Sequence, residues 1–299
     1  MTTNETELRK PAFSVVIPTY NRAKALKRCL DSLVDQTFKN FEVLVCDDGS
    51  SDNTQDIVET FTGKLNLTYL WSPNWGGPAR PRNIGIQKAN APWVCFLDSD
   101  DWWYDNKLEV CSRYIENFDI IHHDVNAVID EYKVGKRIKS RDLSDAPHFE
   151  LLSNGNTLAT SSTCVRTEVL RGMLGFSEEK ELVAVEDYDL WLRIARAGYR
   201  FKHVPEALSA YWMGGDNISR RDAVQIKRIE AVYERHLKYL SDKEAKLAGY
   251  MKSYYVGKIY YDMGNFAVAR SHFKQSLKLN NKEYKFKSLL FGILSLWKK

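Results

Sequence analysis

Short apolar runs alternate with amphipathic segments along the first part of the chain. Runs rich in β-branched and aromatic residues predict strands at residues 13–17, 41–46, 67–71, 93–97 and 120–122. Between them, apolar positions spaced three and four residues apart predict helices at 23–35, 53–62, 79–90 and 105–117. Strands that alternate with helices in this way predict an α/β protein with a doubly wound, mainly parallel sheet.

The pattern changes twice beyond this region. Residues 130–156 are polar and predict a long loop or a hairpin, and apolar periodicity returns in a helix at 186–197. From residue 222 onward the periodicity is helical only, with a tetratricopeptide-like helix pair at 244–262 and 266–279. One such pair cannot form a solenoid, so it predicts a helical cap or a docking surface. We expect a polar tail at 1–11, a sheet domain at 12–220 and a helical region at 221–299.

The composition narrows the class of protein. Apolar residues make up 44% of the chain and charged residues 27%, which is ordinary for a globular protein and excludes a disordered chain or a coiled-coil rod. The net charge of +4 is too small to indicate nucleic-acid binding by itself, and we expect no nucleic-acid partner. Five cysteines without a CxxC motif predict buried, reduced thiols in a cytoplasmic protein.

The sequence indicates no membrane-spanning segment but leaves contact with a membrane surface open. Residues 1–10 lack the apolar segment of a signal peptide, and no run of 18 apolar residues predicts a transmembrane helix. Residues 284–299 combine large apolar side chains with flanking lysines. They predict either an interfacial helix that binds anionic lipid or a helix that packs on the rest of the protein. The first alternative would make the protein peripheral on the cytoplasmic membrane face.

Polar side chains follow four of the predicted strands, at the point where each strand ends. These segments are Pro18–Asn21, Asp47–Ser50, Asn74–Gly77 and Asp98–Asp101. Because ligands of open α/β sheets bind beyond the carboxyl ends of the strands, we expect the segments to share a site. Their five aspartates would repel one another if all were ionised and unpaired, and Mg²⁺ or Mn²⁺ would relieve this repulsion. The alternative is that the aspartates are turn residues and helix caps.

Two common nucleotide-binding motifs are absent. The chain has no GxxxxGK[ST] sequence, and no GxGxxG follows the first predicted strand. A P-loop enzyme and a dinucleotide-binding Rossmann domain are therefore unsupported. A nucleotide held by carboxylates and a metal, rather than by a glycine-rich loop, indicates nucleotide-sugar or nucleotidyl chemistry.

Six segments in a fixed order carry a resemblance to a known family. They are residues 15–21 (VVIPTYN), 36–38 (QTF), 41–52 (FEVLVCDDGSSD), 82–86 (RNIGI), 96–103 (FLDSDDWW) and 186–193 (EDYDLWLR). Together they resemble the inverting family 2 glycosyltransferases, which have the GT-A fold, over residues 1–220. The resemblance implies transfer of a sugar from a nucleotide diphosphate-sugar, most often a UDP-sugar, to an acceptor hydroxyl.

The resemblance also implies roles for individual residues of the donor site. Asp48 would hydrogen-bond the base, which Tyr20 and the backbone around Thr19 would flank. The residues that it assigns to the nucleotide are Pro18, Thr19, Tyr20, Asn21, Asp48, Arg82, Asp98 and Ser99. The residues that it assigns to the metal, Mn²⁺ or Mg²⁺, are the DXD pair Asp98 and Asp100, with Asp101 as a helper.

The candidate general base lies in the last of the six segments. The resemblance assigns to Asp187 the removal of the proton from the attacking acceptor hydroxyl. Glu186 beside it would position the acceptor or a neighbouring backbone group. Acidic residues also favour the first turn of a helix, so both residues have a structural alternative as capping groups. The two roles are compatible, and we expect both.

Acceptor contacts are less clearly indicated. Trp102 and Trp103 follow the DXD pair and offer rings that could stack on a sugar, but a buried strand-to-helix turn would use them equally well. Ser161 lies in a segment that resembles the acceptor side of family members. We carry all three as candidate acceptor residues.

One segment departs from the family pattern. Relatives often have Tyr-Arg-x-His where this chain has Tyr211-Trp-Met-Gly214, so Trp212 replaces the arginine and Gly214 replaces the histidine. Two alternatives follow: weaker metal binding, with Asp216 as a substitute ligand, or a mobile lid hinged at Gly214-Gly215.

The sequence therefore predicts a glycosyltransferase that uses a nucleotide diphosphate-sugar, a divalent metal and a glycan or lipid-linked acceptor. A nucleotidyltransferase is the alternative enzyme, because it also uses paired aspartates and Mg²⁺. A degenerate nucleotide-sugar-binding module is the alternative without catalysis. No motif indicates the donor sugar, the acceptor linkage or the oligomeric state.

Overall fold

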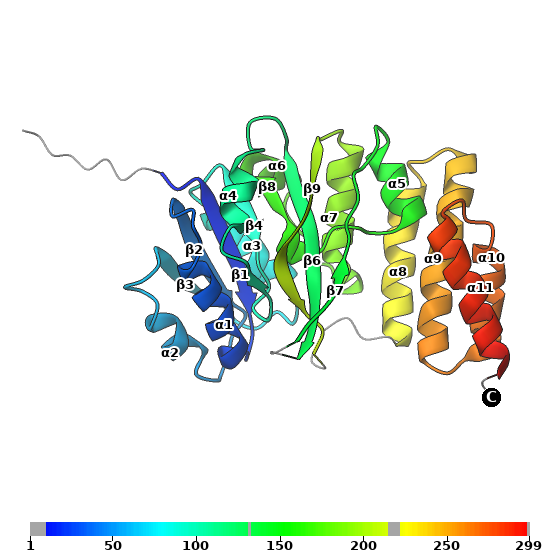
Figure 1. The fold of residues 1–299 in the computed structure, drawn as a ribbon, viewed down its shortest axis with the longest axis horizontal. Helices are drawn as coiled ribbons and strands as arrows, with labels where there is room; N and C mark the ends of the chain where they lie inside the picture. Colours follow the sequence, from blue (N-terminus) through cyan, green and yellow to red (C-terminus); the bar gives the residue numbers. More distant parts are fainter. Residues whose placement is uncertain (1–9, 131–132, 215–221, 298–299) are drawn as a thin grey trace, which may run out of the picture. The chain divides into compact units, whose positions relative to one another are not determined.

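The computed structural model describes residues 10–130, 133–214 and 222–297 (Figure 1). The chain forms two compact units whose segments alternate along the sequence. The sheet unit holds the described residues up to 140 together with 159–175 and 200–213. The helical unit holds 141–158, 176–199 and the described residues from 214 onward. Two segments that the sequence analysis placed in the domain at 12–220 therefore belong to the helical unit.

The first half of the sheet is parallel. Its strands are β1 (Phe13–Thr19), β2 (Phe41–Asp47), β3 (Leu67–Trp71) and β4 (Trp93–Phe96). They lie in the order β3-β2-β1-β4, with every neighbouring pair parallel (Figure 1). This order brings the ends of β1, β2 and β4 to one edge of the sheet, as the polar segments after these strands predict.

Helices cover both faces of this parallel half. They are α1 (Ala23–Val34), α2 (Thr54–Glu59), α3 (Ala79–Lys88), α4 (Lys107–Ser112) and α6 (Thr167–Gly172). Phe13, Val15 and Ile17 of β1 share one buried core with residues of α1, α2 and α4. The other face of β1 carries Val16, against which Gly85 of α3 packs. The doubly wound arrangement is confirmed.

The second half of the sheet is mixed. The strands are β5 (Trp102–Trp103), β6 (Ile120–Asp130), β7 (Lys133–Ile138), β8 (Cys164–Arg166) and β9 (Phe201–Trp212). Strand β8 runs antiparallel to both β4 and β6, whereas β9 runs parallel to β6 and antiparallel to β5. Strands β6 and β7 form a hairpin, which was one alternative for residues 130–156, but nearly all of β6 precedes that region. A short helix at Pro147–Asn154, inside the same region, was not predicted. No sequence pattern predicted β5, β8 or β9.

The helical unit contains five of the longer helices. They are α7 (Glu186–Arg196), α8 (Ala223–Leu237), α9 (Asp242–Asp262), α10 (Phe266–Ser276) and α11 (Lys282–Trp297), together with the shorter α5 (Pro147–Asn154). Ser241 and Glu244 form a capping box at the start of α9, and Asn265 caps α10. Met251 and Phe273 lie in the core between α9 and α10. Within the described residues, no helix combines the length and apolar character needed to cross a membrane.

All five cysteines are buried and free, as predicted. Cys95 of β4 and Cys164 of β8 are directly paired across neighbouring strands.

Candidate active site

The loops after β1 and β2 are tied together by Asn21. Its backbone adopts the left-handed region, with φ of 49°. Its N–H donates to Ser50 Oγ at 2.8 Å, and its Oδ1 accepts the N–H of Ser51 at 2.8 Å. Asn21 therefore has a structural task in addition to the nucleotide contact that the resemblance implies.

Pro18, Thr19 and Tyr20 directly precede Asn21 at the end of β1. Pro18 and Thr19 end β1 and are buried, and the carbonyl of Thr19 accepts the N–H of Asp48 at 2.9 Å. The buried Thr19 Oγ1 has no hydrogen-bond partner among the described residues. Tyr20 is 47% exposed, so its ring is open to a ligand.

Asp47 and Asp48 have different surroundings although they are adjacent. Asp47 is fully buried and accepts hydrogen bonds from Tyr69 Oη at 2.6 Å and from the N–H of Ser50 at 2.7 Å. Asp48 is 3% exposed and accepts the N–H groups of Trp75 at 2.8 Å and Gly76 at 3.0 Å. Asn74 Nδ2 also donates to Asp48 Oδ2 at 3.4 Å. Asp48 thus fixes the loop after β3, and its Oδ1 has a second lone pair for another donor.

The DXD pair follows β4, and each aspartate faces an arginine. Asp98 accepts a hydrogen bond from Arg82 at 2.6 Å, and Asp100 is paired with Arg22. The two carboxylate side chains remain partly exposed, at 28% and 18% respectively. Burial, and then the nearby charge of Asp98, raise the pKa of Asp100, while Arg22 opposes this shift. Ser99 between them is buried.

Asp101 differs from the two aspartates before it. It is 1% exposed, and its Oδ1 accepts the N–H of Trp212 at 2.7 Å. Burial and the charges of Asp100 and Asp98 raise its pKa well above the usual range. The carboxyl group therefore joins the end of β9 to the DXD loop inside the protein, and its role as a metal helper stays a prediction.

The donor set fits a divalent cation that is bound together with a phosphate group. The carboxylates of Asp98 and Asp100 are hard oxygen ligands, and Mg²⁺ usually binds through one or two carboxylates plus substrate phosphates. Among residues 10–130, 133–214 and 222–297, no three His, Cys, Asp or Glu side chains gather as a complete metal site. The arrangement thus suits a metal–diphosphate pair and offers no protein cage for the ion alone.

Two of the candidate acceptor residues support the DXD loop from inside. Ser161 is 2% exposed, and its Oγ accepts the N–H of Asp98 at 3.0 Å. Trp103 is also 2% exposed, and its Nε1 donates to the carbonyl of Ser161 at 2.9 Å. Lys107 Nζ lies 3.5 Å from the centre of the Trp103 ring. The structure therefore favours the alternative of a buried turn for Trp103.

Trp102 is more accessible and stacks with an arginine that the sequence analysis did not single out. The guanidinium of Arg28 lies 4.0 Å from the centre of the Trp102 ring and 4.8 Å from that of Trp212. The same guanidinium donates to the carbonyl of Asp100 at 2.8 Å. Arg22 directly precedes α1 and Arg28 lies in the middle of this helix, where a single arginine carries no sequence signal for a site.

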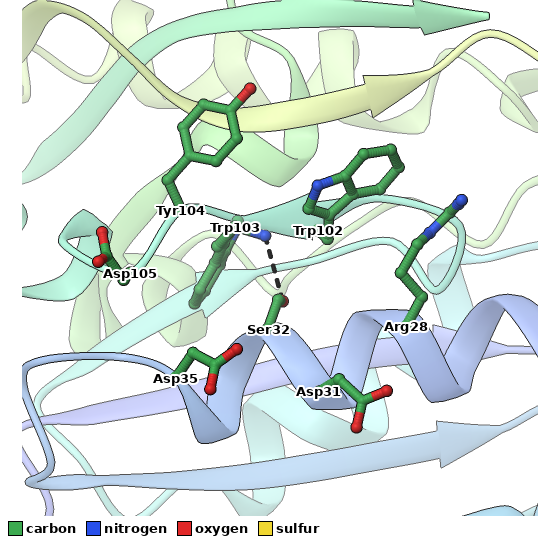
Figure 2. A pocket seen from close by; sticks show the side chains of 8 residues that line it. All are labelled: Arg28, Asp31, Ser32, Asp35, Trp102, Trp103, Tyr104 and Asp105. Atoms are coloured by element: carbon green, nitrogen blue, oxygen red, sulfur yellow. Dashed lines mark hydrogen bonds between the residues drawn. The ribbon is translucent and has the colours of Figure 1, made fainter. Parts of the chain in front are cut away.

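A groove runs between α1 and the segment that follows the DXD pair (Figure 2). Its volume is about 780 Å³. It is lined by Arg28, Asp31, Ser32, Asp35, Trp102, Trp103, Tyr104 and Asp105. Figure 2 shows the hydrogen bond that the N–H of Trp103 donates to Ser32 Oγ, at 3.2 Å, across the floor of the groove.

The candidate base belongs to the helical unit. Glu186 and Asp187 form the start of α7, after Ala184 with φ of 65°. Glu186 is buried, whereas Asp187 is half-buried and its Oδ1 accepts the N–H of Tyr188 at 2.7 Å. Tyr188 in turn donates its hydroxyl to the carbonyl of Leu151 at 2.9 Å, which anchors this first turn. The position agrees with the expected stabilisation of acidic groups by the helix dipole.

The structure describes only part of the segment after Tyr211 that departs from the family pattern. Trp212 ends β9, and its backbone holds Asp101 as described above. Gly214 is described, but Gly215 and Asp216 lie outside the described residues. The substitute ligand and the lid therefore stay predictions.

Comparison with known proteins identifies the class of this fold and site. The profile of the family described as Glycosyl transferase family 2 matches residues 14–171. The amylovoran biosynthesis glycosyltransferase AmsB of Erwinia amylovora is 30% identical over 218 residues, which cover 68% of this chain and 70% of AmsB. The chain belongs to glycosyl transferase family 2 and has the GT-A fold.

Other relatives are longer than this chain. The poly(ribitol-phosphate) β-N-acetylglucosaminyltransferase TarS of Staphylococcus aureus is 36% identical over 180 residues, covering 58% of this chain and 31% of TarS. An uncharacterized glycosyltransferase of Rickettsia bellii is matched over 30% of its length. The crystal structure of S. aureus TarS 1–349 with UDP has a TM-score of 0.62 at 25% identity, covering 95% of this chain and 80% of that one.

Proposed function

We propose that this glycosyltransferase moves a sugar from a UDP-sugar to a hydroxyl of a glycan or lipid-linked acceptor, with inversion at the anomeric carbon. The observation that carries the proposal is the DXD pair at the end of β4, with partly exposed carboxylates and an arginine beside each. The similar TarS structure with UDP supports the choice of nucleotide.

The donor site works through the loops at the edge of the parallel half-sheet. Asp48 accepts a hydrogen bond from the base, and the exposed ring of Tyr20 flanks the base together with the backbone of Pro18, Thr19 and Asn21. This role is supported by the exposed ring of Tyr20 and by the second lone pair of Asp48 Oδ1. Ser99 and Asp98 contact the ribose, and Arg82 supports the diphosphate.

A divalent metal, Mn²⁺ or Mg²⁺, would be held by Asp98 and Asp100. When bound, it supplies Lewis-acid stabilisation of the negative charge that develops on the leaving nucleotide diphosphate. Arg22 and Arg82 already face these carboxylates and provide fixed positive charge at the same place.

Asp187 takes the proton from the acceptor hydroxyl as this oxygen attacks the anomeric carbon. One displacement needs one base, so a single carboxylate in this role is consistent with inversion. The buried Glu186 holds the first turn of α7 and positions its neighbour. The half-buried state of Asp187 supports the role, because a base must be accessible to the acceptor yet fixed in place.

The acceptor is proposed to be a growing surface polysaccharide or a lipid-linked glycan. The names of two relatives support this class, since AmsB is described for amylovoran biosynthesis and TarS for poly(ribitol-phosphate). Such an acceptor is consistent with a cytoplasmic enzyme at the inner face of the membrane. Trp102 beside the DXD pair, with its accessible ring, is the candidate for a sugar contact.

The experiment is release of UDP from a panel of UDP-sugars, without added acceptor, with Mn²⁺ and with EDTA. Wild-type protein is expected to release UDP from one of the UDP-sugars. This release is expected in Mn²⁺ and not in EDTA. Asp187→Asn is expected to lower the rate by about 10²- to 10⁴-fold, the usual contribution of a general base. Asp56→Asn is the matched control, because Asp56 is an exposed aspartate in the first turn of α2.

Three outcomes contradict the proposal. Equal rates of UDP release for wild type and Asp187→Asn would show that Asp187 is not the base. Pyrophosphate release from a nucleoside triphosphate and a sugar phosphate, in place of UDP release, would favour the nucleotidyltransferase. Metal-dependent binding of UDP-sugars with no UDP release, even when lipid-linked glycan is supplied, would favour the binding module.

A further inference from the structure

The outward face of α11 carries an unusual number of large apolar side chains. Those with at least 39% of their surface exposed are Phe286, Leu289, Leu290, Ile293, Leu294, Leu296 and Trp297. Trp297 is 84% exposed and Leu296 67%. Single exposed apolar residues are ordinary, but a contiguous group on one helix marks a binding surface.

The inward face of the same helix combines two aromatic residues, Tyr284 and Phe291, which pack on the core between α9 and α10, with small and polar residues. Ser288 and Ser295 are buried, and a Cβ added at Gly292 would lie 3.9 Å from Phe273 of α10. Ser276 donates its hydroxyl to Ser288 Oγ at 2.8 Å. An ordinary surface helix buries its apolar stripe in the protein, whereas α11 buries only two of its aromatic side chains and leaves most of its large apolar side chains exposed.

The exposed side chains follow the helical repeat and form one stripe. Phe286, Leu290, Ile293 and Trp297 are spaced by four, three and four residues, so they lie one above another on one side. Ser288 and Ser295, seven residues apart, mark the opposite side. The stripe thus runs along the whole of α11 and faces away from α10.

Basic residues accompany this stripe. Residues 282–299 contain five of the 43 basic residues of the chain and one of its 39 acidic residues, so the rest of the chain has equal numbers of each. Within α11, Lys282 and Lys285 are exposed, and Lys287 is paired with Glu283 at 2.5 Å. The entire net positive charge of the protein therefore lies in the segment that carries the apolar stripe.

We propose that α11 lies in the surface of an anionic lipid bilayer, with the stripe from Phe286 to Trp297 in the acyl boundary and its lysines at the phosphate groups. Apolar residues on one face and lysines at its borders are the combination that holds an amphipathic helix in an interface. Lysine stems can lie along the apolar boundary while their ammonium groups reach the anionic headgroups.

The charge distribution favours this occupant over a second copy of the chain. Two α11 stripes packed on each other would bring the lysines of both copies together, and Glu283 is the sole acidic residue of the segment. An anionic surface provides the missing opposite charge. The proposed lipid contact does not depend on sugar transfer. Its biological purpose, which is to bring the enzyme to a lipid-linked acceptor, rests on the proposed function.

The test is flotation of the full-length protein with vesicles of phosphatidylcholine containing phosphatidylglycerol, and with vesicles of phosphatidylcholine alone. Wild type is expected to float with the anionic vesicles. Leu290→Glu/Ile293→Glu is expected to weaken binding by about tenfold or more, because both charges enter the apolar face. Lys282→Glu/Lys285→Glu is expected to weaken binding to the anionic vesicles, most strongly at low salt.

Leu174→Glu is the matched control, since Leu174 is 86% exposed in the sheet unit and should leave vesicle binding unchanged. Circular dichroism and UDP release in solution check that each variant is folded and active, which separates loss of lipid binding from loss of function. Two results overturn the proposal: wild type that stays unbound with anionic vesicles, or equal binding by Leu290→Glu/Ile293→Glu. A wild-type dimer that this variant dissociates, without vesicle binding, would assign the stripe to a second copy.

Discussion

The carboxylate of Asp101 accepts the backbone N–H of Trp212 at 2.7 Å, inside the protein. The third aspartate after β4 thus fixes the end of β9, while the two before it face arginines and solvent. Trp212 occupies the position at which relatives often have an arginine. Its ring lies 4.8 Å from the guanidinium of Arg28, which donates to the carbonyl of Asp100. Arg28 of α1 therefore places a positive charge beside the DXD loop.

Substitution of these neighbouring aspartates should give opposite results. Asp101→Asn keeps an oxygen that can accept the Trp212 N–H. It removes a buried ionisable carboxyl group, whose pKa is raised by burial and by the charges of Asp100 and Asp98. We expect equal or higher stability at pH 7 and UDP release within a few-fold of wild type. Asp100→Asn should lower metal-dependent UDP release by roughly 10- to 100-fold or more.

Thermal unfolding and UDP release of the two variants check this pair of predictions. If Asp101→Asn lost activity as severely as Asp100→Asn, with an unchanged unfolding temperature, Asp101 would have to contact the metal or the nucleotide.

The close approach of α3 to β1 should make Gly85 intolerant of a side chain. A Cβ at Gly85 would lie 2.5 Å from Val16 Cγ1 and 3.0 Å from Cys46 Sγ. Gly85→Ala should destabilise the protein by about 1–3 kcal/mol through overpacking, despite the better helix propensity of alanine. Urea unfolding measures the change.

Two companion variants test the cause. Gly249→Ala in α9 meets no atom within 4 Å and should be neutral or stabilising by up to about 1 kcal/mol. Val16→Ala removes the two methyl groups that clash, so its combination with Gly85→Ala should destabilise by less than the sum of the single changes. Additive losses would argue against the clash.

Acid should weaken the helical unit through a buried pair of histidines. His148 Nε2 lies 3.3 Å from His236 Nδ1, and His236 Nε2 lies 3.0 Å from Asp189 Oδ1. Burial, and then the charges of His236 and Arg196, lower the pKa of His148 to about 4, although Glu244 acts in the opposite direction. The folded protein thus keeps His148 neutral at pH values where the unfolded chain protonates it.

The sign of the pH dependence follows from this shift. Between the unfolded pKa of about 6.5 and the folded pKa of about 4, the unfolded state binds more protons, so stability falls as pH is lowered through this window. His148→Gln should flatten this part of the curve of unfolding free energy against pH. Parallel curves for wild type and variant would show that His148 makes no contribution.

The parallel half-sheet could be predicted because its strands are nearly continuous apolar runs. Strands β1 and β2 are buried on both faces and are rich in valine, which makes them distinct in the sequence. Strand β9 is different: it contains Lys202, Pro205 and Glu206, and its pairing with β6 is irregular near Asp124. Its residues gain their strand conformation from β6 and β5, which no local pattern reveals.

In the candidate site too, residues at the ends of the parallel strands could be predicted, whereas residues that depend on the mixed half of the sheet could not. Asp98 and Asp100 could be predicted because strand ends of a parallel sheet meet at one edge, and both keep partly exposed carboxylates. The burial of Asp101, Trp103 and Ser161 could not be, since it depends on β8 and β9. Arg22 and Arg28 were missed because their partners lie far away in sequence and meet them only through folding.

Calorimetric titration of UDP tests the central claim, that the DXD pair binds a nucleotide diphosphate jointly with a divalent metal. We predict that wild type binds UDP in Mn²⁺, that EDTA weakens binding by about tenfold or more, and that Asp98→Asn does the same, as expected when a ligand of a shared metal is lost. Equal affinity in Mn²⁺ for wild type and Asp98→Asn, or no binding of UDP to the wild type, would contradict the account.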